Sequence, residues 1–510
     1  MDTILSGGVN LIIFAAMLGI LIFVHELGHF AVAKRLGIPV LEFGFGFPPR
    51  VIKYWQSNGW IEIQSRRILV PRKFALPANL STGSHVRYKT EIQNGRETLT
   101  GLQVVDEREQ DAALGSPVQF LDPGTEYTIN AIPMGGFVRM LGEEDPGVPG
   151  GFASAKPIVR TPILLAGVTM NFILALFVFT LTTLVTPPYV QIQTTTVVDV
   201  APNSPAALAG LRGGDTITTV NGRDVKHNFP VFKQLIRDYA GRETKLTILR
   251  DNQTLDISLV PRANPPKNEG AVGIRLDGSV GLRVSSVAAG SVADKAGVRA
   301  DDALLFIVDP TKAVPLRDQA ELEQYAINHP GETVDWRIVR GDKLGDPIKV
   351  QIPAQIDAKD AALGLNLQTS LLQAPLRATQ EMWNVVASVP TMISQVLDGS
   401  APANSFVGPV GIYQFTGEVA QRGGLIALLQ LLGLLSLNLA FVNLLPFPAL
   451  DGGRLVFVVL EWIRGGKKID PQKEGLVHLV GIAILLGLMV IISYFDVLRM
   501  ISGQPIIPTP

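Results

Sequence analysis

The chain has 510 residues, of which 47% are hydrophobic and only 17% are charged, and its mean hydropathy is +0.29. These values favour a multi-domain membrane protein over a single small soluble domain. The 44 basic and 45 acidic residues nearly cancel, so the charge argues against a nucleic-acid partner. The absence of cysteine excludes disulfides, thiolate metal ligands and cysteine nucleophiles.

The first apolar segment predicts a membrane-spanning helix that carries the strongest chemical motif in the chain. Residues 3–24 contain no charge, and the run lacks the basic start and short length of a cleaved secretory signal. Residues 25–29 read HELGH. On a helix His25 and His29 lie one turn apart on one face, so both can bind one metal ion. Glu26 can then reach the metal-bound water, as in the H-E-x-x-H pattern of zinc hydrolases.

Position strengthens this interpretation more than the motif alone. Ionisable side chains inside a spanning helix are costly and are by default functional, which disfavours the alternative that the two histidines merely satisfy helix packing. Lys34, Arg35, Arg50 and Lys53 follow the segment closely, whereas no Lys or Arg precedes it. By the positive-inside rule the histidine end of this helix faces the cytoplasm.

The loop that follows contains two β-rich segments. Residues 43–47 read FGFGF, which suits an interfacial or re-entrant strand that lines a cleft and lets another backbone approach at Gly44 and Gly46. Residues 125–140 place Pro133 and a Gly-Gly pair between two β-rich runs, which predicts a hairpin. The polar residues between these segments, about 59–122, show no motif.

The second apolar segment is uncharged from Pro162 to Val185 and follows Lys156 and Arg160, so it should run from the cytoplasm outward. It contains Asn171. A lone Asn in a spanning helix most often makes an interhelical hydrogen bond, and a catalytic role is the alternative.

Residues 189–368 are soluble in composition and contain a repeat. The segment AGLRGGD at 209–215 recurs 87 residues later as AGVRADD at 296–302, a period suited to two small domains. Both copies, and most clearly AGLRGGDTITTVNG at 209–222, resemble the PDZ domain. This resemblance implies a groove that takes a peptide as an added strand, while a purely steric role as a cap is the alternative.

Apolar residues at helical spacing between 371 and 397 predict an amphipathic helix, bent at Pro390, that either lies on the membrane or packs as an ordinary core stripe. The third span follows Arg422 and ends in NLLPFPALDGG at 443–453, where two prolines free backbone groups from the helix. Five basic residues between 454 and 473 then place Asp451 on the cytoplasmic side, with the histidines. We therefore expect Asp451 to be a third metal ligand rather than only a turn residue.

A fourth span begins near residue 476, and His478 at its start is expected at the membrane interface rather than on the metal.

With these motifs in hand, the chain resembles the site-2 protease family of intramembrane zinc metalloproteases, in particular the bacterial sigma-E regulator type with tandem PDZ domains. HELGH, FGFGF, GTEYTINAIPMGGFVRMLGE at 124–143, AGVTMNF at 166–172, GPVGIY at 408–413 and NLLPFPALDGG carry the resemblance.

The resemblance implies Zn²⁺ bound by His25, His29 and Asp451, with Glu26 as the general base. It further implies that Asn443 and the Gly44-Phe45-Gly46 strand hold the substrate backbone. Asn171 is a further candidate for substrate binding. Residues 59–122 depart from the family pattern as an insertion, which leaves the role of this loop open.

The expected function is hydrolysis of peptide bonds in the spanning segments of single-span membrane proteins, such as pre-trimmed anti-sigma factors or signal-peptide remnants. The resemblance implies an upstream site-1-type protease that trims the substrate and a bacterial-type plasma (inner) membrane. A non-catalytic membrane adaptor that displays tandem PDZ domains is the main alternative. A metal transporter is a second, although one isolated His pair makes a poor relay.

The expected fold is a multi-pass α-helical membrane protein with four transmembrane helices, two extracytoplasmic PDZ-like α/β domains and a cytoplasmic-side, membrane-associated β-hairpin, with both termini extracytoplasmic. The expected segments are 1–37 (first span), 38–160 (cytoplasmic-side loop), 161–187 (second span), 189–275 and 276–368 (PDZ-like domains), 371–422 (amphipathic extracytoplasmic helix and linker), 423–453 (third span), 454–475 (cytoplasmic loop), 476–495 (fourth span) and 496–510 (extracytoplasmic tail).

Overall fold

The computed structural model divides the chain into two compact units, each described here by itself. The first unit comprises residues 1–179 and 378–510, and the second comprises residues 180–377. The structure describes residues 2–502 except 106–114, 186–188, 192–194, 226–228, 251–252, 267–268, 277–279, 310–311, 317–318, 341–342, 345–347, 358–359, 361, 368 and 398–406.

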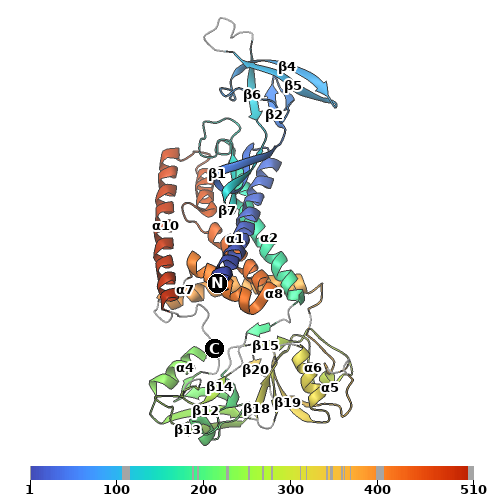
Figure 1. The fold of residues 1–510 in the computed structure, drawn as a ribbon, viewed down its shortest axis with the longest axis vertical. Helices are drawn as coiled ribbons and strands as arrows, with labels where there is room; N and C mark the ends of the chain where they lie inside the picture. Colours follow the sequence, from blue (N-terminus) through green and yellow to red (C-terminus); the bar gives the residue numbers. More distant parts are fainter. Residues whose placement is uncertain are drawn as a thin grey trace. The chain divides into compact units, whose positions relative to one another are not determined.

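Long apolar helices form the frame of the first unit (Figure 1). Four of the described helices are long and apolar enough to cross a membrane: Gly8–Arg35, Pro157–Val185, Gly423–Leu444 and Pro471–Ile501. The elements of this unit are α1 (Asp2–Arg35), β1 (Val40–Gln56), β2 (Gly59–Ile63), β3 (Arg66–Val70), β4 (His85–Gln93), β5 (Arg96–Val104), β6 (Ser116–Asp122), β7 (Glu126–Met140), α2 (Pro157–Val185), α7 (Ala374–Leu397), α8 (Pro409–Leu444), α9 (Asp451–Ile463) and α10 (Pro471–Ile501).

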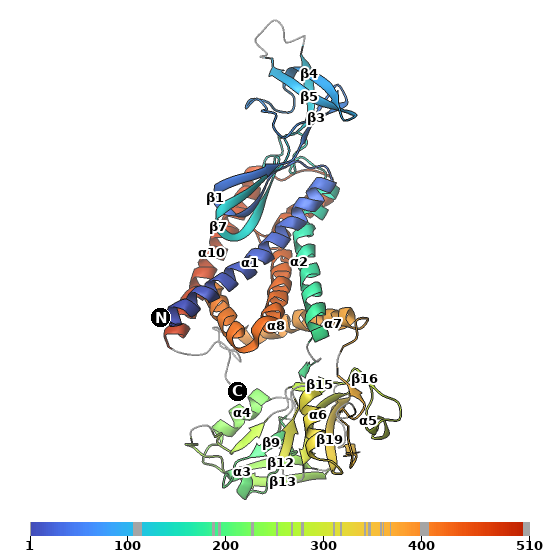
Figure 2. The ribbon, with the colours of Figure 1, turned by 45° about the vertical axis from the view of Figure 1, so that its right-hand side comes forward.

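Helices α1, α2 and α8 pack against one another, and Figure 2 shows them side by side. Met17 and Leu21 of α1 contact Val178 of α2 and Leu431 of α8 in one buried cluster. Gly28 brings the backbones of α1 and α2 together, because an added Cβ there would lie 2.4 Å from the carbonyl oxygen of Ala166. Small residues that permit such close approach are a common device in membrane helix packing.

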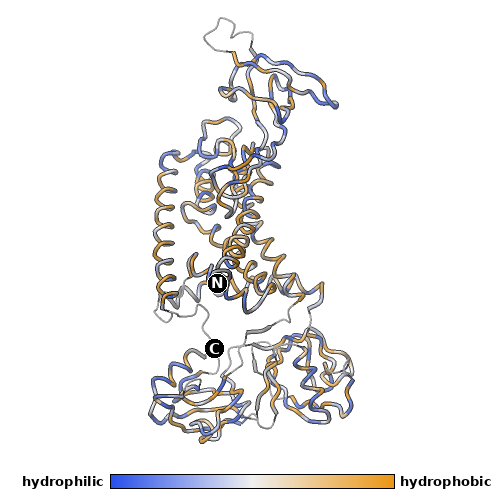
Figure 3. The backbone as a smooth tube through the Cα atoms, viewed as in Figure 1, coloured by the Kyte–Doolittle hydropathy of each residue, from blue (hydrophilic) through white to orange (hydrophobic). Residues whose placement is uncertain are grey.

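Helix α10 is hydrophobic along most of its length (Figure 3). Many of its large apolar side chains are exposed. Only 6% of its most apolar window is buried within the protein. A contiguous exposed surface of this kind indicates contact with lipid, since in water it would be an aggregation liability.

Helix α7 packs against two of the spanning helices. Ala378, Met382 and Val385 contact Phe179 of α2 and Leu437 of α8. The other face keeps Trp383 and Leu376 exposed. The helix continues through Pro390. One face of α7 is therefore a packed apolar stripe, and the other face leaves apolar side chains exposed.

The segment before the third span is helical rather than a linker. Helix α8 starts at Pro409 and continues to Leu444, with a kink at Gly424, whose φ of 60° lies in the left-handed region that glycine tolerates. The expectation of a linker up to residue 422 is therefore wrong for 409–422, while 398–406 lie outside the described residues. The span also ends at Leu444, and Asp451 opens a separate helix, α9.

Strands β1 and β7 form an interleaved sheet of four arms. The 40–45 arm of β1 pairs on one side with residues 126–129 and on the other with residues 136–140, while residues 50–56 pair with 126–130. The predicted hairpin at 125–140 is therefore wrong in its pairing, because the first arm of β1 lies between its two arms. Sequence patterns mark a chain reversal but do not say which strand fills the space inside it.

Residues 59–105 and 115–122 form a closed barrel in the order β2-β3-β5-β4-β6. All pairs in it are antiparallel except β3 with β5. Ile61, Ile63, Ile68 and Leu99 fill its interior and are almost fully buried. The loop without a motif is thus a small domain with its own core.

The second unit contains two similar modules, and each has a main sheet of its own. Strand β8 pairs with β15, so residues 189–191 belong to the sheet of the second module, although we expected them in the first. The elements are β8 (Tyr189–Gln191), β9 (Val197–Val200), α3 (Pro205–Leu208), β10 (Thr216–Val220), β11 (Arg223–Asp224), α4 (Phe229–Asp238), β12 (Thr244–Arg250), β13 (Gln253–Leu259), β14 (Ile274–Leu276), β15 (Val280–Arg283), β16 (Ser286–Val287), α5 (Val292–Lys295), β17 (Ala303–Asp309), β18 (Lys312–Pro315), α6 (Gln319–Asn328), β19 (Thr333–Arg340), β20 (Lys343–Leu344), β21 (Ile348–Gln351) and β22 (Leu365–Asn366).

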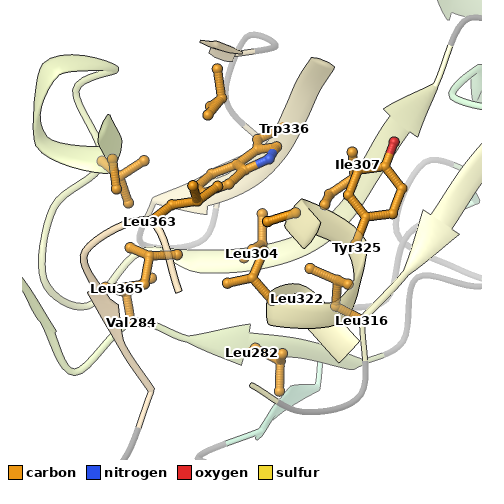
Figure 4. Packing of buried hydrophobic residues seen from close by; sticks show 14 of the residues in the cluster. Leu282, Val284, Leu304, Ile307, Leu316, Leu322, Tyr325, Trp336, Leu363 and Leu365 are labelled. Atoms are coloured by element: carbon orange, nitrogen blue, oxygen red, sulfur yellow. The ribbon is translucent and has the colours of Figure 1, made fainter. Parts of the chain in front are cut away.

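The sequence repeat reappears as a repeated ion pair. Asp215 is 1% exposed and accepts from Arg250, and Asp302, equally buried, accepts from Arg340. Arg250 also donates to the carbonyl oxygen of Gly210, just after the short helix α3, and Arg340 donates to that of Gly297, just after α5. The second module is built around Trp336, whose ring packs beside Leu304 and Leu363 (Figure 4).

Candidate metal centre

Three side chains from two distant segments converge on one point. His25 Nε2 lies 3.2 Å from His29 Nε2 and 3.0 Å from Asp451 Oδ2, and His29 Nε2 lies 3.4 Å from the same oxygen. Atoms bound tetrahedrally to one zinc ion at about 2.0–2.1 Å lie about 3.4 Å from one another. The arrangement therefore fits a zinc ion with three protein ligands and one open position. Asp451 Oδ2 is buried and has no hydrogen-bond donor, as expected of an oxygen that serves a cation.

The local folds explain why these residues meet. His25 and His29 are one turn apart on α1, and they precede its basic end at Arg35 by about 15 Å and about 9 Å along the helix axis. Asp451 is the first residue of α9. A carboxylate in the first turn of a helix interacts favourably with the helix dipole.

Each imidazole is oriented by a second contact. His29 Nδ1 lies 2.8 Å from the carbonyl oxygen of Ile163, which can only accept, so Nδ1 carries the proton and Nε2 is free to bind metal. His25 Nδ1 lies 3.2 Å from Asn171 Nδ2, while Asn171 Oδ1 is buried without a partner. Turning the amide would let Oδ1 accept from a protonated Nδ1, which metal binding through Nε2 requires. The structure places Asn171 against His25.

Glu26 lies beside the ligands and contacts the sheet. Its Oε2 accepts a hydrogen bond of 3.1 Å from the backbone N–H of Val138 in β7. Its carboxylate also interacts electrostatically with both histidines and with Asp451. Through this hydrogen bond, residues 136–140 of β7 lie directly beside the metal centre.

Gly167 of α2 is a site residue that the sequence motifs did not single out. A Cβ built on it would lie 2.4 Å from His29 Nε2 and 2.7 Å from His25 Nε2, closer than real contacts allow. Only glycine lets α2 pass this close to the histidine pair. A small residue on the helix that faces the HExxH motif could have indicated this role. The sequence alone, however, does not say which helix faces the motif.

Replacing Gly167 with Ala should weaken zinc binding by at least about tenfold, because the added methyl group displaces one or both ligand nitrogens. Zinc affinity of the purified protein, measured by competition with a chelator, checks this. Gly487→Ala in α10 is the matched control, since a Cβ there meets no atom within 4 Å. Equal zinc affinities of the two variants would contradict the role of Gly167.

The turn before Asp451 packs tightly against the start of α9. The two residues after Asp451 have no room for a Cβ atom and are glycines. A Cβ on Gly452 would lie 2.2 Å from the carbonyl oxygen of Leu445, and one on Gly453 would lie equally close to that of Phe447. Arg454 donates to Glu143 at 2.7 Å. Burial lowers the pKa of Arg454, but the carboxylates of Glu143, Asp451 and Glu144 together raise it by more, so its pKa lies above the ordinary value.

Asn443 lies partly buried in the last turn of α8. Gly44 and Phe45 lie in the arm of β1 that has a neighbour on each edge, and Gly46 follows them. The backbone groups of Gly44 and Phe45 are therefore paired within the sheet, and a role of the Gly44–Gly46 segment in holding the substrate stays a prediction. The arm at 136–140 has no other described strand on its outer edge, and it is the one in contact with Glu26.

Comparison with known proteins identifies relatives over nearly the whole chain. The model of Peptidase family M50 matches residues 13–70 and 113–488 and omits most of the barrel. The regulator of sigma-E protease RseP of Salmonella typhimurium is 27% identical over 520 residues, covering 96% of this chain and 99% of its own. The zinc metalloprotease RasP of Bacillus licheniformis is 26% identical, and the regulator of sigma-W protease RasP of Bacillus subtilis is 25% identical, with the same coverage of both chains.

Proposed function

The chain belongs to peptidase family M50 and is an intramembrane zinc metalloprotease of the site-2 protease type, and on that premise we propose that His25, His29 and Asp451 hold the zinc ion. The observation that carries this assignment is the convergence of two Nε2 atoms and one Oδ2 within 3.0–3.4 Å. A non-catalytic adaptor or a transporter gives no reason for three ligands and a carboxylate base to meet in one place.

Zinc bound there would supply an acidified water near pH 7 and a positive charge that polarises a substrate carbonyl. Glu26 takes the proton from the attacking water and later delivers it to the leaving amine. Asn171 and the Ile163 carbonyl keep the imidazoles in the tautomer and orientation that metal binding needs. Asn171 is thus assigned to the metal centre rather than to the substrate.

We assign the active site to the cytoplasmic side of a bacterial-type inner membrane. Lys34 and Arg35 form the basic end of α1, and Lys467, Lys468 and Lys473 follow α9, so the positive-inside rule puts both halves of the metal centre on that side. The same rule puts the two modules of 189–368 and both termini outside. In these modules, which we regard as PDZ-like, a peptide groove and a steric cap remain the two alternatives.

The substrate class follows from the site and from the relatives. A protease within the membrane must act on spanning segments, whose helical carbonyls become accessible only after local unwinding. An unwound segment can be presented in extended form to Glu26 by contact with the β1–β7 sheet, and Asn443 is available to hold its backbone. Relatives that bear the name regulator of sigma-E or sigma-W protease suggest membrane-bound anti-sigma factors, pre-trimmed by another protease, as substrates.

Metal removal tests the proposal on the full-length protein in detergent with a model single-span substrate. We expect a zinc chelator to stop cleavage and added Zn²⁺ to restore it. The reason is that the attacking water is activated by the metal ion that the three ligands hold. A substrate with a proline-free leucine span, which resists unwinding, is the control and should be cleaved poorly throughout. Undiminished cleavage by protein whose zinc content has fallen below detection would refute the proposal.

A further inference from the structure

His478 is not one of the three converging ligands, but it holds the turn that carries Asp451. The turn spans Leu445–Leu450 and contains Pro446 and Pro448, which have no N–H. Of its four backbone N–H groups, those of Leu445, Phe447 and Leu450 donate to main-chain carbonyls of α8 or of the turn. The fourth, that of Ala449, donates to His478 Nδ1 at 2.9 Å.

The bond to Ala449 falls on the strained residue of the turn. Ala449 has a φ of 80°, a left-handed conformation that costs a non-glycine residue free energy and persists only where its surroundings impose it. Asp451 lies two residues later. Any relaxation of Ala449 would therefore change the direction in which the Asp451 carboxylate points.

Helix α10 is itself fixed against the same turn. A Cβ on Gly481, one turn after His478, would lie 2.5 Å from Pro448 Cβ and 2.6 Å from its carbonyl oxygen, so the two backbones are in direct contact. The imidazole of His478 also packs on Phe457 of α9, with ring centroids 5.3 Å apart. The acceptor is thus held at a defined place relative to the turn.

The tautomer of His478 follows from this bond. Because Nδ1 accepts, the neutral ring carries its proton on Nε2. That nitrogen is buried and has no hydrogen-bond partner, and the nearest carboxylate oxygen, on Glu474, is 3.9 Å away. The histidine therefore serves the turn through one nitrogen and does not act as a metal ligand.

We propose that His478 is a positioning residue for proteolysis, which aims Asp451 at the metal by fixing Ala449 in its left-handed conformation. Helix α10, which supplies no metal ligand among the described residues, is a support for the metal centre through His478 and Gly481. The inference rests on the proposed zinc site. It adds to that site the residue that fixes the orientation of Asp451, the third ligand.

The test compares three substitutions of His478 in the full-length protein. In Asn the amide oxygen stands as many bonds from Cα as Nδ1 does in His, whereas in Gln it stands one bond further, where Nε2 would be. His478→Asn should keep the bond to Ala449, and His478→Gln and His478→Leu should lose it. The residue borders a cavity of about 530 Å³, so side chains of these sizes can be accommodated.

We expect His478→Leu and His478→Gln to raise the Kd for zinc by about 10- to 100-fold, the usual effect of losing a group that orients a metal ligand. The same variants should lower kcat at saturating zinc and change KM by less than about twofold, since the substrate is not touched. His478→Asn should restore zinc affinity and kcat to within a few fold of the wild type. Chelator competition and cleavage of a model single-span substrate provide the readouts.

Two outcomes would overturn the inference: wild-type zinc affinity and kcat in His478→Leu, or equal losses in the Asn and Gln variants, which would indicate general packing. The Asn–Gln comparison decides the matter even if the Leu variant folds poorly. Asp451→Ala in parallel separates the two proposals. If it keeps its zinc the proposed site fails, whereas zinc loss in Asp451→Ala but not in His478→Leu and His478→Gln rejects only the role of His478.

Discussion

Substituting Glu26 by Gln lowers peptide-bond cleavage by at least about 10²- to 10⁴-fold and leaves zinc bound, because the amide cannot accept the proton of the attacking water. Gln has nearly the same shape and can still accept the hydrogen bond from the Val138 N–H through its oxygen. The fold of the site should therefore persist. Cleavage of a model single-span substrate and zinc content by mass spectrometry, measured on one preparation, check both halves of this expectation.

Glu42→Gln is the matched control for that experiment. Glu42 is buried in β1 of the sheet that Glu26 contacts, and it accepts a hydrogen bond from Thr128. It is not one of the three converging ligands. The control should retain cleavage. Turnover of Glu26→Gln at a rate close to that of the control would remove Glu26 from the mechanism.

Substituting Asp451 by Ala should abolish both zinc binding and cleavage. The change removes one of only three protein ligands, so zinc affinity should fall by more than the roughly 10- to 100-fold that follows loss of an outer partner. Asp451 also opens α9, where its charge favours the helix start, so part of any destabilisation would be structural. Asp451→Asn keeps the volume and separates the two effects.

Asp470→Ala is the control for the Asp451 variants. Asp470 caps the start of α10 through a bond to the Gln472 N–H and is not one of the three converging ligands. Its loss should cost helix stability but not zinc. Full zinc content in Asp451→Asn and Asp451→Ala would show that the third ligand has been misassigned.

The two halves of the metal centre could be predicted from the sequence because each has a local signature. The spacing of His25 and His29 needs only helix geometry, and Asp451 lies on their side of the membrane by the charge of the flanking loops. These arguments are independent of tertiary structure, so they succeed without it.

The supporting residues could not be predicted in this way. The role of Gly167 depends on the two histidines of α1 that face it from across the α1–α2 contact. The role of His478 depends on the strained Ala449, which lies next to it in space but 29 residues earlier in the chain. Such residues carry no charge pattern or period of their own. Their roles come from tertiary packing, which a single sequence does not specify.

The β-rich loop shows the same limit. Turn residues near 133–136 correctly mark where β7 reverses, but the arm that fills the reversal comes from β1, about 90 residues earlier. Long-range pairing of this kind leaves no short-range signal. The barrel at 59–122 was missed for another reason: its fully buried side chains are spread over five strands, which contribute only one or two each, so no single strand stands out.

X-ray absorption at the zinc edge tests the central claim most directly, because it reports the ligands of the metal itself. On the zinc-loaded wild-type protein we predict a four-coordinate ion with scattering from two imidazoles and two oxygen atoms, at about 2.0–2.1 Å. A spectrum with no imidazole contribution, or one that is unchanged in Asp451→Ala, would contradict the account of a zinc ion shared by α1 and α9.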